Sequence, residues 1–256
     1  MLRLFAALMA LTFCLSPARA AEEVVAGLSQ NLVSINATFV GSEILIFGAV
    51  KRDTPAPADE PLEVVVVVEG PSGPVTVRRK DKRFGIWVNT EALDLASAPS
   101  FYAVATSADL DKSISVLDDL RHLVSVSQTI KVSESPFTNV DPTSFTEALI
   151  RIRENAGTYR LVENSVNIYK DTLFDARIAL PSNLIEGDYR TRIFLTRGGY
   201  VSAHYETVIN VRKVGLERWI YNLAHSQPLI YGLLSLVIAI AAGWGASAVF
   251  RVIQRG

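Results

Sequence analysis

The stretch EVVVVVE, residues 63–69, decides the fold class of this chain. Side chains of a β-strand alternate between the two faces of a sheet, so five consecutive valines cannot all point into one core. A strand of this composition belongs in a sheet that is covered on both faces. We therefore predict a buried strand with a second sheet on one face and a helix or a neighbouring domain on the other.

Short segments on both sides of this stretch have the pattern of further strands, separated by Gly/Pro turns. Leu32–Phe39 and Glu43–Val50 are expected to be two strands joined by a tight turn at Val40-Gly41-Ser42. Gly198-Gly199 sits where a hairpin turn needs positive φ. Further strands are expected at Val75–Val77, Arg83–Val88, Phe101–Thr106, residues 177–181, residues 187–195 and residues 200–211. The spacing predicts a mainly β, Ig-like sandwich.

Two helices are expected to interrupt the strands. Asp109–Val124 has apolar residues at intervals of three and four, with Ser107 or Asp109 able to cap it. Thr143–Asn155 has the same rhythm. The loop at residues 133–142 precedes this second helix and is the best candidate for an internal boundary. It separates a β-sandwich-like region, residues 21–132, from a helix and β-meander in residues 143–213 that could pack with it.

The chain opens with the pattern of a secretory signal peptide, residues 1–20. Arg3 precedes an apolar run, and Ala18-Arg19-Ala20 forms a small-x-small cleavage site. Cys14 is the only cysteine, so a chain cut after Ala20 would contain none. Cysteine catalysis and Cys-based metal sites are then excluded.

The other end of the chain has the pattern of a membrane anchor. The 22 residues from Leu229 to Phe250 include no charged side chain. As a helix they would reach about 33 Å, which matches the hydrocarbon core of a bilayer. We expect a transmembrane helix at residues 228–250 and a short tail at residues 251–256. Because a signal peptide directs the export of the chain behind it, the bulk of the chain is expected outside and the tail inside.

The stretch GLERWIYNLAHSQPLIYG, residues 215–232, precedes the anchor. Its apolar residues recur at i, i+3, i+4 and i+7, which predicts an amphipathic helix lying in the membrane interface over residues 214–227. Pro228 is expected to start or kink the spanning helix. The candidate residues for contact with the interface are Trp219, Tyr221, Tyr231 and Arg251.

Small residues recur at every fourth position of the anchor, at Ser235, Ala239, Gly243 and Ser247. On a helix they form one narrow stripe along which another helix can approach closely. About half of the segment consists of small residues, so coincidence is the alternative. The partners expected are therefore the lipid bilayer and a membrane protein or a second copy bound through this helix.

Five cations occupy six positions at Arg78, Arg79, Lys80, Lys82 and Arg83. Because the run falls between two expected strands, it is interpreted as a solvated hairpin tip. The alternative is a contact with an anion, with lipid headgroups or with an acidic partner.

The sequence offers little that predicts catalysis. His122 follows Asp118 by one helical turn and suits an ion pair or half of a metal site, and His204 shares a strand face with Glu206. There is no G-x-S-x-G motif and no phosphate-binding loop. Glu22 and Glu23 are interpreted as a solvated chain end. We expect no cofactor, no metal and no enzyme, and a net charge of −1 gives no reason to expect nucleic acid.

The chain resembles the alphaproteobacterial putative transmembrane protein family, an uncharacterised group. The residues that carry the resemblance are Leu173-Phe174 before Leu180-Pro181, Glu186-Gly187-Asp188-Tyr189, Asn222-Leu223-Ala224-His225, Pro228–Gly232 and Gly243-Trp244. The resemblance covers essentially the whole chain. It implies a signal peptide and one C-terminal span, and it brings no catalytic residues.

These observations predict a single-pass protein of a bacterial inner membrane, with its bulk in the periplasm and its tail in the cytoplasm. Its expected role is that of a non-enzymatic accessory or interaction module for a transporter or an envelope complex. The first alternative is a tethered ligand- or anion-binding domain. The second is a periplasmic enzyme, which would need clustered polar groups in a cleft near His204.

Overall fold

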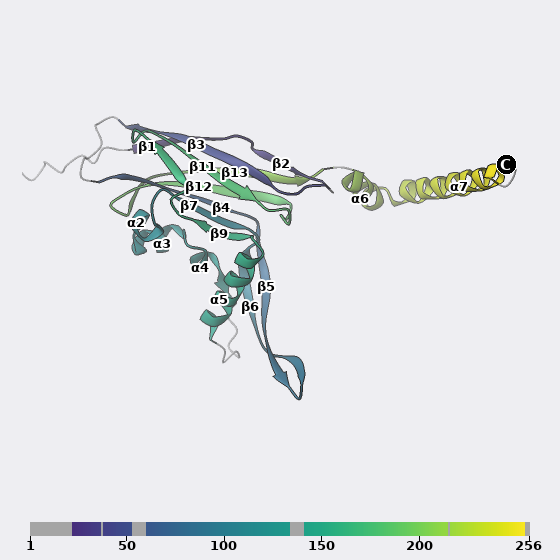
Figure 1. The fold of residues 1–256 in the computed structure, drawn as a ribbon, viewed down its shortest axis with the longest axis horizontal. Coiled ribbons are helices and arrows are strands. Elements are labelled where there is room, and N and C mark those ends of the chain that lie inside the picture. Colours follow the sequence, from purple (N-terminus) through teal and green to yellow (C-terminus); the bar gives the residue numbers. More distant parts are fainter. Residues whose placement is uncertain (1–21, 37, 53–59, 134–140, 215, 254–256) are drawn as a thin grey trace, which may run out of the picture.

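The structure, a computed structural model, describes residues 22–36, 38–52, 60–133, 141–214 and 216–253. The predicted signal peptide lies outside these ranges, as do most of the predicted linker and residues 254–256 of the predicted tail. The described chain is mainly β, as predicted, and ends in two helices that extend away from the strands (Figure 1).

One sheet has four strands, all paired antiparallel. Its order across the sheet is β1 (Glu22–Leu28), β3 (Ser42–Arg52), β11 (Leu173–Leu180) and β10 (Val166–Tyr169). It therefore joins strands from both sides of the predicted linker.

A second sheet has six strands and also mixes the two regions. Its order is β2 (Leu32–Ile35), β13 (Tyr200–Lys213), β12 (Gly187–Arg197), β4 (Leu62–Glu69), β7 (Tyr102–Thr106) and β9 (Tyr159–Val162). The pairings at its two edges, β2 with β13 and β7 with β9, are parallel, and the inner pairings are antiparallel. The Ig-like topology stays a prediction.

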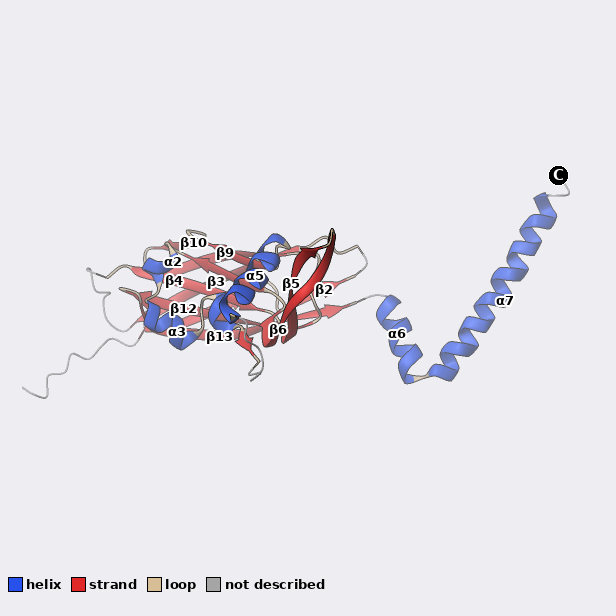
Figure 2. Cartoon of the chain, turned by 90° about the horizontal axis from the view of Figure 1, so that it is seen from below, coloured by secondary structure: helices blue, strands red, loops and turns tan. Residues whose placement is uncertain are grey.

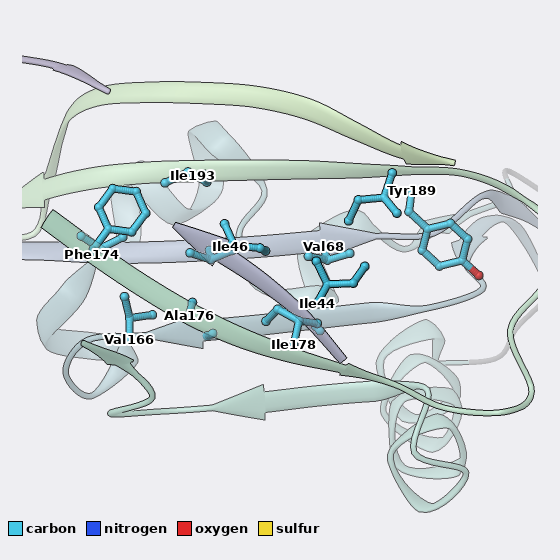
Figure 3. Packing of buried hydrophobic residues seen from close by; sticks show 14 of the residues in the cluster. Ile44, Ile46, Val68, Val166, Phe174, Ala176, Ile178, Tyr189 and Ile193 are labelled. Carbon is cyan, nitrogen blue, oxygen red and sulfur yellow. The ribbon is translucent and has the colours of Figure 1, made fainter. Parts of the chain in front are cut away.

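The two sheets face each other across the first hydrophobic core. Figure 3 shows Ile44 and Ile46 of β3 with Ile178 of β11, which pairs with Ile44, facing Val68 and Ile193 of the six-stranded sheet. All five side chains are buried. This burial of apolar side chains from both sheets holds the sandwich together.

The valine stretch occupies β4, near the centre of the six-stranded sheet, and its side chains enter two different cores. Val64, Val66 and Val68 lie in the core between the sheets. Val65 and Val67 lie in a second core on the opposite face of the six-stranded sheet. All five have no exposed surface. The prediction of a strand covered on both faces is confirmed.

Helices and a long hairpin cover that opposite face and form a third layer (Figures 1 and 2). The helices are α2 (Leu110–Ser113), α3 (Val116–His122), α4 (Val126–Thr129) and α5 (Pro142–Asn155). The hairpin consists of β5 (Ser72–Arg83) and β6 (Ile86–Pro99), and β8 (Lys131–Val132) pairs with the base of β6. Asp141 caps α5 by accepting from the backbone N–H groups of Thr143 and Ser144.

The predicted hairpin of Leu32–Phe39 and Glu43–Val50 is wrong, because these strands belong to different sheets. β2 ends at Ile35 and pairs in parallel with β13, whereas β3 pairs with β1 and β11. The side chain of Asn36 accepts from the backbone N–H of Thr38 at 3.0 Å and turns the chain out of the strand. The connection therefore crosses from one sheet to the other.

The single helix predicted at Asp109–Val124 is also wrong, since α2 and α3 are separated there. Ser115 has extended backbone angles (φ −72°, ψ 153°), and its side chain caps α3. Its backbone N–H donates to the carbonyl of Gly199 in the β12–β13 turn at 2.7 Å. This tertiary hydrogen bond takes the place of the helical one, so the apolar rhythm is interrupted. Leu117 and Leu120, two of the apolar residues that form this rhythm, are exposed.

Two helices follow β13 at the C-terminal end. α6 spans Leu216–Ser226 and α7 spans Pro228–Ile253, with Gln227 between them. Pro228 is the first residue of α7, where its missing N–H is not needed. Of the two predicted roles, starting the helix or kinking it, the structure shows the first.

Candidate interaction surfaces

The apolar helix α7 has no cover from the rest of the described chain. Its most hydrophobic part, Pro228–Ser247, has a mean hydropathy of 2.0 and none of it is buried. Leu229, Ile238 and Trp244 are among the exposed apolar side chains. A helix that is apolar on every side, and that the described strands and body helices leave uncovered, has the length and composition to cross a bilayer.

The predicted interface residues lie on both sides of the break between α6 and α7. Trp219 and Tyr221 are exposed on α6, and Tyr231 is partly exposed in the first turns of α7. The Tyr221 ring stacks on His225 with 4.0 Å between ring centroids. Arg251 belongs to the last turn of α7, and its side chain lies outside the described residues. The arrangement fits an aromatic collar at the start of the span.

The predicted small-residue stripe lies on one continuous helix. Ser235, Ala239, Gly243 and Ser247 are all within α7 and are exposed. Ser235 donates its hydroxyl to the carbonyl of Tyr231 at 2.8 Å, which removes the need for a partner outside the helix. A side chain built at Gly243 would meet nothing within 4 Å in the described structure. The stripe is open to lipid or to another helix.

The basic run was predicted to lie between two strands, but it lies within β5. Arg78, Arg79, Lys80, Lys82 and Arg83 are all in the second half of this strand. The hairpin turn comes after them, at Phe84-Gly85, where φ is 50° and 83°. The part of the interpretation that concerns solvent is confirmed, because all five side chains are exposed.

The end of this hairpin carries three exposed apolar side chains that the sequence reasoning did not single out. Phe84 is fully exposed, and Ile86 and Trp87 are 65% and 68% exposed. We call Lys80–Asn89 the hairpin tip. The available signal was the run RFGIW, residues 83–87, in which a glycine sits between large apolar residues directly after the cations.

Arg79 differs from the other cations of the run because it is held at the base of the hairpin. It forms an ion pair with Glu91 at 2.8 Å and donates to the hydroxyl of Ser144 on α5 at 3.2 Å. Its guanidinium also lies 5.0 Å from the ring centroid of the buried Phe145. Arg79 therefore fastens the hairpin to α5 and is not part of a free basic patch.

A shallow apolar hollow opens on the outer face of the four-stranded sheet. Its volume is about 510 Å³ and it is lined by β1, β3 and β11 and by Tyr169 of β10. Phe47, Tyr169 and Leu173 are half-exposed around it. Gly27 contributes no side chain to it, and a side chain there would meet the ring of Phe47 at 3.1 Å. A hollow of this size falls in the range of ligand sites, although most of its rim is open.

Asp118, which was predicted to pair with His122, has other partners in the structure. Asp118 is buried and pairs with Arg121 at 2.9 Å, and it accepts the backbone N–H of Val201 at 2.8 Å. The predicted pairing of Asp118 with His122 is therefore wrong. Asp118 instead ties α3 to the start of β13.

His122 packs against Phe194 at 5.3 Å between ring centroids, and the ring centroid of His204 lies 6.3 Å from that of His122. Burial lowers the pKa of His122, and the charges of His204, Arg121 and Arg192 lower it further against the opposing effect of Asp118. No group of three His, Cys, Asp or Glu side chains that could hold a metal ion occurs within the described ranges, which include His204 and Glu206.

Glu22, at the start of β1, was interpreted as a solvated chain end, and that interpretation is wrong because its side chain is only 6% exposed. Its carboxylate accepts from the guanidinium of Arg197 at 2.8 and 3.1 Å and from the hydroxyl of Ser202 at 2.8 Å. Arg52 lies 3.6 Å away. Glu23 does match the interpretation, because it is exposed and pairs with Lys51 at 2.9 Å.

Burial alone would raise the pKa of Glu22. The hydrogen bonds from Arg197 and Ser202, together with the positive charges of Arg197 and Arg52, outweigh that effect and hold the pKa below its usual range. The carboxylate is therefore ionised at neutral pH, and it links β1 to the end of β12 and the start of β13. Its role is to fasten strands of the two sheets.

The family to which the sequence matches agrees with the C-terminal helix. The family model described as "Putative transmembrane protein (Alph_Pro_TM)" matches residues 23–252. The sporulation control protein Spo0M from Bacillus subtilis matches with a TM-score of 0.27 and 10% identity, over 79% of this chain and 53% of that structure. The chain thus spans about half the length of that protein. No curated protein matches the chain.

The family and the exposed apolar helix together support a protein held in a membrane by a single span. The match begins at Glu23, one residue into β1, and ends within α7, so it includes both the body and the anchor. The chain belongs to the putative transmembrane protein family, Alph_Pro_TM.

Proposed function

We propose that this chain is a membrane-anchored, non-enzymatic interaction module. Its body stands in the periplasm, α7 crosses the bacterial inner membrane, and the tail ends in the cytoplasm. The module acts as an accessory to another membrane protein, such as a transporter or an envelope complex, or binds a second copy of itself. The orientation rests on the signal-peptide pattern of residues 1–20.

The observation that carries this proposal is the isolation of α7. None of the span packs on the described body, and Gly243 faces open space. In a bilayer, lipid tails are as apolar as the helix, so association of helices depends on close packing. The stripe that includes Ser235, Ala239 and Gly243 allows such an approach, because no large side chain holds a neighbour away.

Replacing Gly243 with leucine tests the proposal. The added side chain keeps a partner helix at a distance, and association is expected to fall by roughly 5- to 30-fold. Gly245→Leu is the matched control, because Gly245 is also open but lies on a different side of α7 from the stripe. Association is measured by energy transfer between labelled copies of the full chain in vesicles, and by crosslinking from α7 in native membranes.

The two arms separate the two kinds of partner. A loss of energy transfer identifies a second copy, and a loss of one specific crosslinked protein identifies a different partner. If both substitutions leave both signals unchanged, α7 is only an anchor and this proposal is wrong.

The hollow on the four-stranded sheet favours a second candidate function, a tethered domain that binds an apolar ligand. Bound octanoate, used as a probe, would shield the backbone of β1 and β3 and slow its hydrogen exchange in nanodiscs. At ten times the dissociation constant, the expected slowing is about tenfold. Leu173→Asp at the rim should abolish it, and Leu120→Asp, an equally exposed apolar site on α3, should not. Unaltered exchange in the unmodified chain would eliminate this candidate.

A further inference from the structure

The long hairpin reaches well beyond the rest of the body. Figures 1 and 2 show β5 and β6 leaving the body in the half from which α6 and α7 continue. The two strands have 12 and 14 residues, but β8 and α5 accompany only their base. The hairpin tip therefore makes no contribution to either hydrophobic core.

A β-bulge marks the border between the fastened base and the tip. The register shifts between Arg79 and Lys80, where β6 has one extra residue. On the base side, Arg79 is held by Glu91 and α5. On the tip side, no hydrogen bond or ion pair with another described residue involves the side chains of Lys80, Lys82 or Arg83. Bulges of this kind re-aim the strand that continues beyond them.

The turn at the tip contains a strained residue, and no contact within the folded body offsets the strain. Phe84 has φ 50°, a left-handed conformation that is rare for a bulky side chain, and such strain costs stability. Asparagine or glycine would fit this turn better. The Phe84 ring is fully exposed, so packing of the ring does not offset the strain. An aromatic side chain kept in a strained and exposed position indicates a contact outside the folded body.

The cations and the apolar side chains of the tip are adjacent across the two strands. Lys82 is directly opposite Trp87, and Arg83 is directly opposite Ile86. Opposite residues of an antiparallel pair place their side chains on the same face. Both faces of the tip therefore combine one cation with one large apolar group. This combination is typical of segments that lie in the interface of an anionic membrane.

The size of the tip distinguishes lipid from a protein partner. A stable protein interface buries about 800 Å² on each side, which the end of a two-stranded hairpin does not provide. A bilayer needs no complementary surface, and the family and α7 already place one beside the body. We propose that the hairpin tip is a second membrane contact, in which its apolar side chains enter the headgroup region and its cations pair with anionic lipids. This proposal does not depend on what α7 binds.

The test monitors the fluorescence of Trp87 in the full chain. Trp219→Phe and Trp244→Phe leave Trp87 as the only tryptophan of the three. The protein is reconstituted into phosphatidylcholine vesicles with and without phosphatidylglycerol. With the anionic lipid, Trp87 emission should shift to shorter wavelength, acrylamide quenching should fall, and brominated lipid should quench it. Added salt should reverse the three changes.

Two kinds of variant separate the contact from the fold. Lys82→Gln and Arg83→Gln should each lower the ratio of docked to undocked tip by about fivefold. Lys170→Gln, an exposed cation in the β10–β11 turn, should leave that ratio unchanged. Phe84→Asn should also reduce docking while keeping or raising the melting temperature, because asparagine tolerates positive φ. If this variant docks less but melts at the same or a higher temperature, unfolding is not the cause of the reduced docking.

Three outcomes would overturn the proposal. Trp87 that stays in water in both kinds of vesicle shows that the tip does not touch lipid. Equal burial with and without phosphatidylglycerol shows that the cations play no part. Trp87 that is protected in detergent as well shows that protein, such as a second copy, covers the tip.

Discussion

Replacing Glu22 with glutamine is expected to lower the free energy of unfolding of the body by about 3 kcal/mol. The change removes the negative charge between two arginines and keeps the shape of the side chain. Arg197 and Arg52, both largely buried, are then left without their counter-charge. The expected loss is at the low end for a broken buried pair, because Arg197 keeps its hydrogen bond to the Glu60 carbonyl.

The adjacent glutamate is the matched control. Glu23 pairs with Lys51 in solvent, and Glu23→Gln should change the free energy of unfolding by less than about 0.5 kcal/mol. Both values come from urea unfolding of the full chain in detergent micelles. Equal effects of the two substitutions would contradict the role of Glu22 as a fastening between strands.

The Glu22 effect should also depend on pH with a defined sign. The pKa of Glu22 is lowered in the folded state, so its carboxylate stabilises the fold above the unfolded pKa of about 4.3. That contribution is lost as the pH falls through the lower, folded pKa. The gap between the unmodified chain and Glu22→Gln should stay constant from pH 7 to about pH 5 and close below about pH 4. A gap that widens in acid would reverse this assignment.

Val66→Ala and Val67→Ala are each expected to cost about 2 to 3 kcal/mol. The two residues are neighbours in sequence, but Val66 lies in the core between the sheets and Val67 in the core under the helices. Both are fully buried on a strand that is paired on each side by β12 and β7. Each substitution therefore leaves a cavity that close-packed neighbours cannot easily fill.

The comparison with an ordinary strand makes this measurement specific. Val208 of β13 is 42% exposed, and Val208→Ala should cost less than about 0.5 kcal/mol. Unfolding of the three variants is measured by urea titration in the same micelles. A small effect at Val67 alone would mean that the helical layer is not part of the cooperative fold.

The central strand could be predicted from sequence because its composition is compatible with few environments. Five consecutive valines require apolar cover on both faces, and no long-range information is needed to reach that conclusion. The same holds for α7, where the length of an uncharged run is compared with the thickness of a bilayer. The Gly198-Gly199 turn results from backbone sterics alone.

The errors arise where a distant partner overrides a local pattern. Leu32–Phe39 looked like the first strand of a hairpin, but its pairing partner is the remote strand β13. The helix expected at Asp109–Val124 is interrupted because Ser115 bonds to Gly199, more than 80 residues later. Neither partner can be read from the sequence near these segments.

The same limit applies to the candidate surfaces. Glu22 looked solvated because its partners, Arg52 and Arg197, are distant in sequence. The cations after Val77 were recognised, but their separation into a fastened Arg79 and a free tip depends on where α5 lies. The apolar hollow has no sequence signal, since separate strands and two glycines form it.

The route by which the body joins its anchor has a mechanical consequence. β13 continues directly toward α6, so tension between the membrane and the body enters this strand at Lys213 and acts along its axis. The β12–β13 ladder runs from Gly187↔Val211 to Arg197↔Tyr200 along that same axis. Tension in this direction shears the ladder, so its hydrogen bonds share the load instead of opening one after another. A body tethered in this way can transmit a pull from the bilayer without losing its last strand.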